Sequence, residues 1–374
     1  MPCEDVALTP DGSDREAVRR CADALAAGAI VAFPTETVYG LAANAAIDDS
    51  VRRLSRIKER GVSQPFTVHI ANRAHCDRFV PSMSPLARRL VRKGWPGPLT
   101  LIFDVADPAA APIYGDLGEA GAAAVYAGRS VGIRCPDDPI AESLLAQAGV
   151  PVIATSANEG GSPPATDGEM VRSTLAEQID WLLDAGPTRY ARSSTVVAIN
   201  GSGYRLVRAG VFDDRTVRRL AAVNVLFVCT GNTCRSPMAE RIFQKLIADK
   251  LGCGVADLEA RNIHVQSAGT MAWTGSPASP EAVEVCRRRG IDLSGHASTA
   301  LTADLIRPAD YIFTMGRHHL EMVRSLVPTA ASKAEPLDPD GDVADPMGGG
   351  QADYEAAVNK IELALIQRLE QVEL

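Results

Sequence analysis

A cysteine and an arginine stand on either side of a short polar stretch in the segment VLFVCTGNTCRSP (225–237). The apolar residues before Cys229 are typical of a buried strand, and the residues from Pro237 onward are typical of a helix start. A strand–loop–helix junction of this kind gathers unpaired backbone N–H groups and the positive end of a helix dipole around one point. The sequence therefore predicts a phosphate-binding loop between Cys229 and Arg235.

Cys229 lies at the base of this loop, where the N–H groups and Arg235 would stabilise its thiolate. The thiolate is the nucleophilic form of cysteine, so one loop could both hold a phosphoryl group and attack it. The alternative is an inert core cysteine, as most buried free cysteines are. Gly231 and Asn232, which tolerate positive φ, and Pro237, which suits a first helical turn, favour the phosphate loop.

The whole chain has the composition of a globular protein. Its 374 residues are too many for one ordinary core, and 46% hydrophobic with 22% charged residues indicates a soluble protein of two domains. A net charge of −8 gives no general nucleic-acid footprint. Eight scattered cysteines without metal-like pairs favour a reducing compartment. Without a leader-like N-terminus or a membrane-length apolar run, we expect a cytoplasmic protein with no membrane contact and no metal site.

Residues 14–210 alternate short apolar strands with helices, which predicts an α/β fold. Polar loops follow several strands, and these residue types suit either a ligand contact or an ordinary turn. Lys58 and Arg60 end an expected helix, where cations are favourable for the helix dipole alone. His69 has apolar neighbours, so a structural histidine is its default interpretation. The stretch 104–126 is rich in Ala, Gly and Pro and is expected to be a loop.

Taken together, the motifs of residues 14–210 resemble the threonylcarbamoyl-AMP synthase family. One motif alone would be a weak sign, but the set in this order is highly specific. The family condenses L-threonine, bicarbonate and ATP to threonylcarbamoyl-AMP and pyrophosphate, which begins the N6-threonylcarbamoyl modification of tRNA adenosine. The resemblance is carried by PTETVYGL (34–41), Lys58-x-Arg60, the histidine of segment 66–70, WPGPLT (95–100), segment 130–134, SAN (156–158), STVV (194–197) and Arg208.

The resemblance implies two groups of ligand-binding residues. Those implied in holding ATP are Lys58, Arg60, Ser130, Ser156, Asn158 and Arg208, and those implied in holding threonine are Thr35, His69, Arg134 and Ser194. Lysine and arginine would neutralise the triphosphate as charge moves to the leaving pyrophosphate, and Arg134 would pair with the threonine carboxylate. ATP would be a substrate that arrives with Mg²⁺, with no tightly bound cofactor. The implied partners are tRNA and the downstream proteins that transfer the threonylcarbamoyl group to it.

The sequence departs from the family pattern in two places. Asp138 stands where the family often has histidine, and Gly61-Val62-Ser63 replaces a segment of proline and basic residues. These departures put loop details and affinity in doubt more than the reaction. An alternative for this domain is an RNA-binding module without synthase activity, because the family fold has a large basic concavity.

Residues 211–222 are short, charged and helix-like, and we interpret them as a linker between a first domain (1–210) and a second domain (223–374). The first is expected to be a twisted α/β domain of the synthase type. The second alternates strands with helices, which predicts a doubly wound parallel sheet with its active site at the carboxyl ends of the strands.

The second domain resembles the low-molecular-weight protein-tyrosine-phosphatase family through its phosphate loop and the pair Asp345-Pro346. The resemblance implies that Cys229 attacks phosphorus, Arg235 binds the equatorial oxygens, and Asp345 protonates the leaving group and later activates water. Ser236 would donate a hydrogen bond to the thiolate. The loop around the phosphate would consist of Thr230, Gly231, Asn232, Thr233 and Cys234.

Two loop residues have roles that the sequence leaves open or assigns to structure. Asn232 is expected to hold the loop in shape. Cys234 is either a buried spacer or a partner that traps oxidised Cys229 as a disulfide. His296, His318 and His319 show no interpretable partner spacing and are expected at the surface or at helix caps.

Thr233 bears on the choice of phosphate ester. Tyrosine phosphatases of this family typically carry a bulky aliphatic residue there and aromatic residues after Asp-Pro. The sequences CTGNTCRSPMAE (229–240) and DPMGGG (345–350) resemble the bacterial protein-arginine phosphatase branch instead. A threonine hydroxyl could hydrogen-bond a guanidinium group or its attacking water. We favour a phosphoarginine protein substrate over phosphotyrosine, and an arsenate reductase is less well supported because no later pair of resolving cysteines is present.

Overall fold

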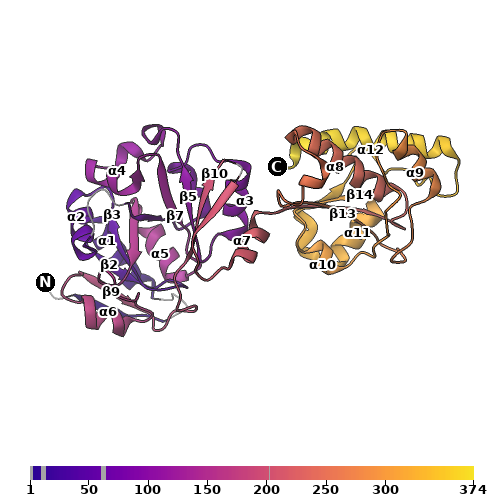
Figure 1. The fold of residues 1–374 in the computed structure, drawn as a ribbon. Helices are drawn as coiled ribbons and strands as arrows, with labels where there is room; N and C mark the ends of the chain where they lie inside the picture. The colour runs from indigo at the N-terminus through magenta and orange to yellow at the C-terminus, as the bar shows by residue number, and fades with distance from the viewer. Residues whose placement is uncertain (1–2, 10–13, 60–64, 202) are drawn as a thin grey trace. The chain divides into compact units, whose positions relative to one another are not determined.

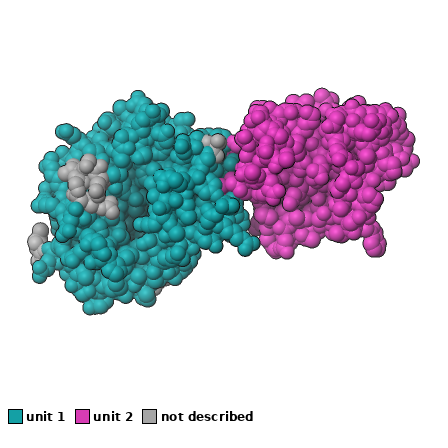
Figure 2. All heavy atoms as spheres, viewed as in Figure 1, with its two compact units in different colours: residues 1–220 teal, residues 221–374 magenta. Residues whose placement is uncertain are grey.

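The computed structural model describes residues 3–9, 14–59, 65–201 and 203–374, and the chain divides into two compact units, 1–220 and 221–374 (Figures 1 and 2). Most of the segment that we interpreted as a linker belongs to the first unit. It contains helix α7 (Asp214–Ala221), whose Val217 is buried and whose Leu220 lies beside Gly94. The second unit begins with strand β12 (Val223–Cys229) directly after α7.

A mixed sheet of eleven strands runs through the described part of the first unit, in the order β1-β9-β2-β3-β8-β4-β7-β5-β10-β11 with β6 paired to β7. The strands that run parallel to a neighbour form the pairs β1–β9, β2–β9, β4–β7 and β5–β10. The bounds are β1 Glu4–Ala7, β2 Val31–Phe33, β3 Gly40–Asn44, β4 Thr67–His69, β5 Leu99–Asp104, β6 Tyr126–Ala127, β7 Ser130–Arg134, β8 Val152–Ser156, β9 Trp181–Asp184, β10 Thr195–Asn200 and β11 Gly203–Arg208.

Helices α1 and α5 pack together and form a core with β2, β3 and β8. The sequence ends α5 clearly: Asp138 caps its N-terminus, Pro139 is its first residue, and Gly149 closes it with φ of 65°. The helices of this unit besides α7 are α1 Arg15–Ala26, α2 Asp48–Ile57, α3 Pro85–Gly94, α4 Glu119–Val125, α5 Pro139–Ala148 and α6 Gly168–Leu175.

The second unit has a parallel four-stranded sheet in the order β13-β12-β14-β15, which confirms the predicted doubly wound fold. Its remaining elements are α8 Arg235–Leu251, β13 Ile263–Gly269, α9 Pro280–Arg287, α10 Ala303–Ile306, β14 Tyr311–Thr314, α11 Arg317–Leu326, β15 Ala334–Pro336 and α12 Gln351–Gln371. In the described part of the chain, none of the helices combines the length and the apolar composition needed to span a bilayer.

Strand β12 shows why helices cover both faces of this sheet. Val225 and Phe227 belong to the core formed with α8, α9 and α12, whereas Leu226 and Val228 belong to the core formed with α10 and α11. Successive side chains of a strand point to opposite faces, so a continuous apolar run requires a hydrophobic partner on each side.

Several elements differ from the sequence-based expectation. The stretch 104–126, expected to be a loop, contains helix α4, which packs against α2. Strand β3 begins at Gly40, inside the PTETVYGL motif, and β15 has only three residues. Such short strands are stabilised by their sheet neighbours and carry little signal of their own.

Gly269, the last residue of β13, lies very close to the loop that follows β12. A Cβ atom there would lie 2.5 Å from the Thr230 carbonyl oxygen and 2.8 Å from the Asn232 nitrogen. We expect Gly269→Ala to lower the free energy of unfolding of the second unit by about 1–3 kcal/mol through overpacking. Calorimetry of the full chain measures this, with Gly295→Ala as the matched control because nothing lies within 4 Å of its Cβ position. Equal melting temperatures of the Gly269→Ala and Gly295→Ala variants would contradict the close approach of Gly269 to the loop after β12.

Candidate active sites

The loop after β12 surrounds the Cys229 sulfur. Cys229 is fully buried at the strand end, and Sγ accepts hydrogen bonds from the Asn232 backbone N–H at 3.2 Å and the Ser236 hydroxyl at 3.0 Å. Asn232 has a positive φ of 53°, whereas Gly231 does not adopt a positive φ. Helix α8 begins at Arg235, two residues before the expected start at Pro237. The strand end, the loop and the first turn of α8 thus enclose one sulfur atom with hydrogen-bond donors.

The side chain of Asn232 connects the loop to its surroundings. Its amide nitrogen donates to the hydroxyls of Ser236 at 2.9 Å and Ser267 at 2.8 Å, and its amide oxygen accepts from the Thr299 N–H at 2.7 Å. These contacts are those of a residue that maintains the shape of the loop.

Arg235 joins the loop to Asp345, which lies 110 residues further along the chain. Its Nη1 donates to the Val343 carbonyl at 3.0 Å, and its Nη2 contacts the Asp345 carboxylate at 2.5 Å and the Thr230 hydroxyl at 3.3 Å. The Arg235 side chain is only 4% exposed, whereas that of Asp345 is 44% exposed. The carboxylate therefore lies at the solvent-accessible side of a buried guanidinium.

Two other loop residues differ in what surrounds them. The Cys234 sulfur lies 3.9 Å from an Asp345 oxygen, and burial raises the pKa of this thiol to about 12. Cys234 is therefore a neutral thiol at physiological pH. The Thr233 hydroxyl is buried and has no hydrogen-bond partner among the described residues. Buried hydroxyls are normally paired, so this one is an exception within the loop.

Two histidines contact the loop, contrary to the expectation that they lie at the surface or at caps. His319 is fully buried, with Nε2 2.9 Å from the Thr230 hydroxyl, and His296 Nε2 lies 2.7 Å from the Asn232 carbonyl oxygen. His319 lies in the first turn of α11, which follows β14, the neighbour of β12 in the sheet. Parallel neighbouring strands end at the same edge of a sheet. The position of His319 directly after β14 was therefore the sequence signal that could have placed it near the loop after β12.

The first unit contains a cavity of about 240 Å³ that gathers seven of the ten residues expected to bind substrates. These are Thr35, His69, Ser130, Arg134, Ser156, Ser194 and Arg208. Lys58 joins them through Asn158 and Ser156: its ammonium group lies 2.9 Å from Asn158 Oδ1 and 3.0 Å from the Ser156 carbonyl oxygen. Arg60 and the segment 61–63 lie outside the described residues.

Strand β7 places two of these residues at opposite ends of the cavity. Ser130, Gly132 and Arg134 alternate along one face of the strand, and all three line the cavity. Four residue steps of about 3.3 Å separate the first from the last by about 13 Å. Gly132 has no side chain to fill the space between them. The serine end and the arginine end can therefore contact different parts of a long ligand, or two ligands.

His69 and Arg134 are neighbours at the end of the parallel pair β4–β7. The His69 ring is buried, and burial, together with the positive charge of Arg134, lowers its pKa to about 3. Nδ1 lies 3.1 Å from the Thr67 carbonyl oxygen, an acceptor, so the neutral ring carries its proton on Nδ1. Nε2 is then a hydrogen-bond acceptor.

The remaining polar residues of the cavity are joined in pairs. The Ser194 hydroxyl lies 2.9 Å from that of Thr100, and Arg208 Nη2 donates to the Ser194 carbonyl at 3.0 Å. Burial, and after it the charge of Arg134, lowers the pKa of Arg208. The positive charges of these two guanidinium groups therefore interact unfavourably.

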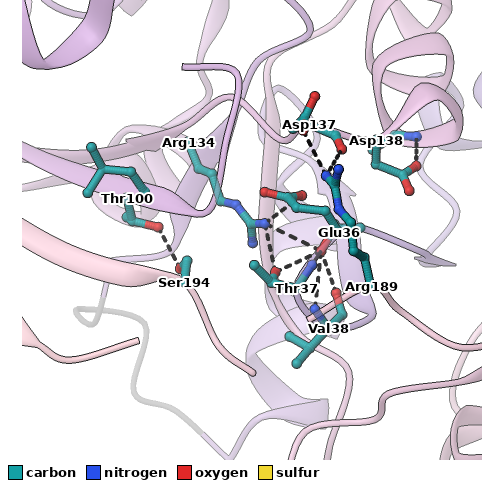
Figure 3. A network of polar contacts seen from close by, with 12 residues as sticks. Glu36, Thr37, Val38, Thr100, Arg134, Asp137, Asp138, Arg189 and Ser194 are labelled. Atoms are coloured by element: carbon teal, nitrogen blue, oxygen red, sulfur yellow. Dashed lines mark hydrogen bonds and ion pairs between the residues drawn. The ribbon is translucent and has the colours of Figure 1, made fainter. Parts of the chain in front are cut away.

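Figure 3 shows a buried carboxylate that the sequence analysis did not single out. Glu36 points toward Arg134, and their charged atoms lie 2.9 Å apart. Glu36 lies inside PTETVYGL, so the motif was noted but this residue was not. Asp138, the departure from the family pattern, is accounted for as the cap of α5: its Oδ1 accepts from the Ile140 and Ala141 N–H groups, and burial raises its pKa to about 6.

Comparisons with known proteins match both units. A family model named for Sua5, YciO and YrdC and described as telomere recombination matches residues 23–210. The model of the low-molecular-weight phosphotyrosine protein phosphatases matches residues 224–374. The chain belongs to the threonylcarbamoyl-AMP synthase family through its first unit and to the low-molecular-weight phosphatase family through its second.

Individual relatives agree with this division. The threonylcarbamoyl-AMP synthase of Bacillus subtilis is 37% identical over 182 residues, which are 48% of this chain and 49% of that protein. The chain thus spans about half the length of that synthase. The protein-arginine-phosphatase of Bacillus subtilis is 35% identical over 155 residues, which are 40% of this chain and 97% of that protein. The solved structure of a Pyrococcus abyssi Sua5 variant is 21% identical to this chain, and the match has a TM-score of 0.51. It spans 89% of this chain and 98% of the Sua5 chain. This similarity concerns the fold alone.

The buried His319 leads to a prediction about pH. Burial lowers its pKa to about 4, below the value of about 6.5 of an exposed histidine. The unfolded chain therefore binds the proton more readily, and the stability that neutral His319 contributes, complete above pH 6.5, is lost as the pH falls toward 4. Between pH 7.5 and 5 this loss amounts to about 1–2 kcal/mol.

Calorimetry of the wild type and His319→Gln at several pH values tests this expectation. Glutamine does not titrate, so the wild type should lose its melting-temperature advantage over the variant as the pH is lowered. A difference in melting temperature that stays constant from pH 7.5 to pH 5 would contradict the buried neutral histidine.

Proposed function

We propose that this protein is a bifunctional enzyme: its first unit is an L-threonylcarbamoyladenylate synthase, and its second is a cysteine-dependent protein phosphatase that acts on phosphoarginine. The observation that supports the synthase is the cavity in which the residues expected for ATP and those expected for threonine line one space. The observation that supports the phosphatase is the Cys229–Arg235–Asp345 arrangement around one loop.

In the synthase, L-threonine, bicarbonate and ATP would give threonylcarbamoyl-AMP and pyrophosphate. Lys58, Ser130, Ser156, Asn158 and Arg208 would hold ATP, together with Arg60. The cationic groups would stabilise the charge that develops on the departing pyrophosphate. Mg²⁺ would arrive with the triphosphate, whose oxygens it binds.

Thr35, His69, Arg134 and Ser194 would hold threonine at the arginine end of β7, where Arg208 contacts Ser194 and would reach from ATP toward threonine. This division agrees with the length of the strand, because Ser130 and Arg134 are about 13 Å apart. The work of the chain is then mainly orientation and charge stabilisation. The product would pass to the proteins that transfer the threonylcarbamoyl group to tRNA.

In the phosphatase, the Cys229 sulfur would attack phosphorus while Arg235 binds the equatorial oxygens. Asp345 would protonate the leaving nitrogen, and afterwards it would take a proton from the water that hydrolyses the cysteinyl phosphate. The hydrogen bond from Ser236 would stabilise the thiolate as the leaving group of this second step. The Asp345 side chain is 44% exposed and therefore has room to turn from Arg235 toward a substrate.

Thr233 supports phosphoarginine over phosphotyrosine. Its buried hydroxyl lacks a hydrogen-bond partner in the described structure, and a guanidinium substrate supplies N–H donors where a phenol ring supplies none.

The eight cysteines are free thiols, which agrees with a reducing, cytoplasmic location.

Pyrophosphate release tests the synthase. Purified protein with ATP, bicarbonate and L-threonine should release pyrophosphate in a threonine-dependent way, and Lys58→Ala should reduce the rate by a factor of about 100, the cost of losing a charge-stabilising group. Cys229→Ser is the control, because the phosphatase site lies in the other unit. No release above the Lys58→Ala level would exclude synthase activity, and retained tRNA binding in that case would favour an RNA-binding module.

Substrate competition tests the phosphatase. The wild type should show a higher kcat/KM on phosphoarginine peptides than on phosphotyrosine peptides, and Thr233→Ile should narrow or reverse this preference by a factor of about 10 or more. Cys229→Ser should be inactive on both substrates. A wild-type preference for phosphotyrosine that Thr233→Ile leaves unchanged would exclude the phosphoarginine assignment.

A further inference from the structure

Glu36 and Arg134 form an ion pair in which both side chains are buried, with 1% and 6% of their surfaces exposed. The distance between Glu36 Oε2 and Arg134 Nη2 is 2.9 Å (Figure 3). Removing two charges from water is costly unless each has a partner. The surrounding residues must therefore hold this ion pair in place. The contacts of Arg134 and Glu36 show how they do so.

The same Nη2 atom has two further oxygen neighbours. It donates to the Thr37 hydroxyl at 2.7 Å, and the Thr35 hydroxyl lies 3.4 Å away. All three neighbours belong to consecutive residues of the PTETVYGL loop. This nitrogen is therefore fully occupied, and the loop fixes the plane of the guanidinium group.

The rest of the guanidinium group remains available. Arg134 lines the cavity, and its Nε–H is buried without a hydrogen-bond partner in the described part of the chain. A buried donor of this kind is costly unless a ligand satisfies it. The loop thus holds one edge of Arg134 and leaves another for the cavity.

Within the described part of the chain, the backbone of Glu36 forms a hydrogen bond but its carboxylate forms none. Neither of its carboxylate oxygens accepts a hydrogen bond from a described residue, whereas its backbone carbonyl accepts from the Tyr190 N–H at 2.9 Å. A carboxylate that served to fix the loop would accept backbone N–H groups, as Asp138 does at α5. The backbone of Glu36 anchors the loop, and its side chain faces Arg134.

We propose that Glu36 is a positioning residue for threonine selection: it orients Arg134 toward the amino-acid carboxylate and balances its charge. This proposal rests on the proposed synthase function, in which Arg134 pairs with that carboxylate. Threonine is a zwitterion, whereas pyrophosphate and the nucleotide phosphates are strongly anionic. Arg134 and Arg208 together, without Glu36, would attract those anions to the threonine end. With Glu36 in place, one of these two positive charges is balanced, which weakens the attraction of this end for a multiply charged anion.

Glu36→Gln is the direct test, because it removes the charge and keeps the size. We expect the KM for L-threonine in pyrophosphate release to rise about tenfold, because Arg134 would no longer be held toward the threonine carboxylate, with the KM for ATP changed by less than about twofold. Added pyrophosphate should become a competitive inhibitor against threonine. Asp137→Asn is the matched control: it removes the carboxylate of the neighbouring, exposed Asp137–Arg189 pair and should leave the threonine KM unchanged.

Thr37 provides a second route if Glu36→Gln fails to fold, as judged by its melting temperature. Thr37→Val removes the hydroxyl at 2.7 Å from Arg134 and should raise the threonine KM, whereas Thr37→Ser keeps the hydroxyl and should restore most of the wild-type value. A merely structural role would predict the same KM for all folded variants.

L-Threoninol, which lacks the carboxylate, separates the two levels of the proposal. If L-threoninol inhibits the wild type with an inhibition constant close to the KM for L-threonine, then Arg134 does not recognise the carboxylate. The assignment of Arg134 under the proposed function is then wrong. If the wild type strongly prefers threonine and folded Glu36→Gln keeps both that preference and the wild-type KM, the positioning role of Glu36 is excluded. A preference that narrows in Glu36→Gln supports it.

Discussion

A guanidinium group can be buried only where other groups compensate its charge, and both candidate sites of this chain are arranged around such a group. Arg134 in the first unit and Arg235 in the second are each almost inaccessible, and each is paired with a carboxylate. In each case Nε remains without a hydrogen-bond partner among the described residues. A fixed, incompletely satisfied guanidinium is a binding site for an anion, and the fold of each unit determines where it lies.

The two carboxylates differ in a way that agrees with different tasks. Glu36 is as buried as its arginine and is confined by the loop that carries it, so it is suited to a constant structural environment. Asp345 is nearly half exposed and lies at the entrance of its site, next to Met347, whose N–H it accepts at 3.2 Å. A residue that must exchange a proton with substrate and water requires this freedom. Under the proposed functions, the same pairing would support orientation in one unit and proton transfer in the other.

Much of the second unit could be predicted from the sequence because its signals are local. The apolar run of β12, the loop and the start of α8 are contiguous, and the parallel sheet follows from their alternation with later strands. His319 and His296 could not be predicted, because their contact with the loop depends on which strands are neighbours. In the first unit, the motifs identified most cavity residues, but Glu36 was overlooked because its partner lies about a hundred positions away. Short strands such as β3 were missed because sheet neighbours, and not their own residues, stabilise them.

The alternation of Ser130, Gly132 and Arg134 along β7 makes this strand a molecular ruler. Loops around the cavity can shift without changing the spacing between its two ends, because the backbone pleat sets it. Side chains along β7 also alternate between the two faces of the sheet, so inserting or deleting one residue between Ser130 and Arg134 would turn one of them to the opposite face. The register of five residues in the middle of a sheet therefore fixes the spacing and facing of the two side chains that we propose contact ATP and threonine.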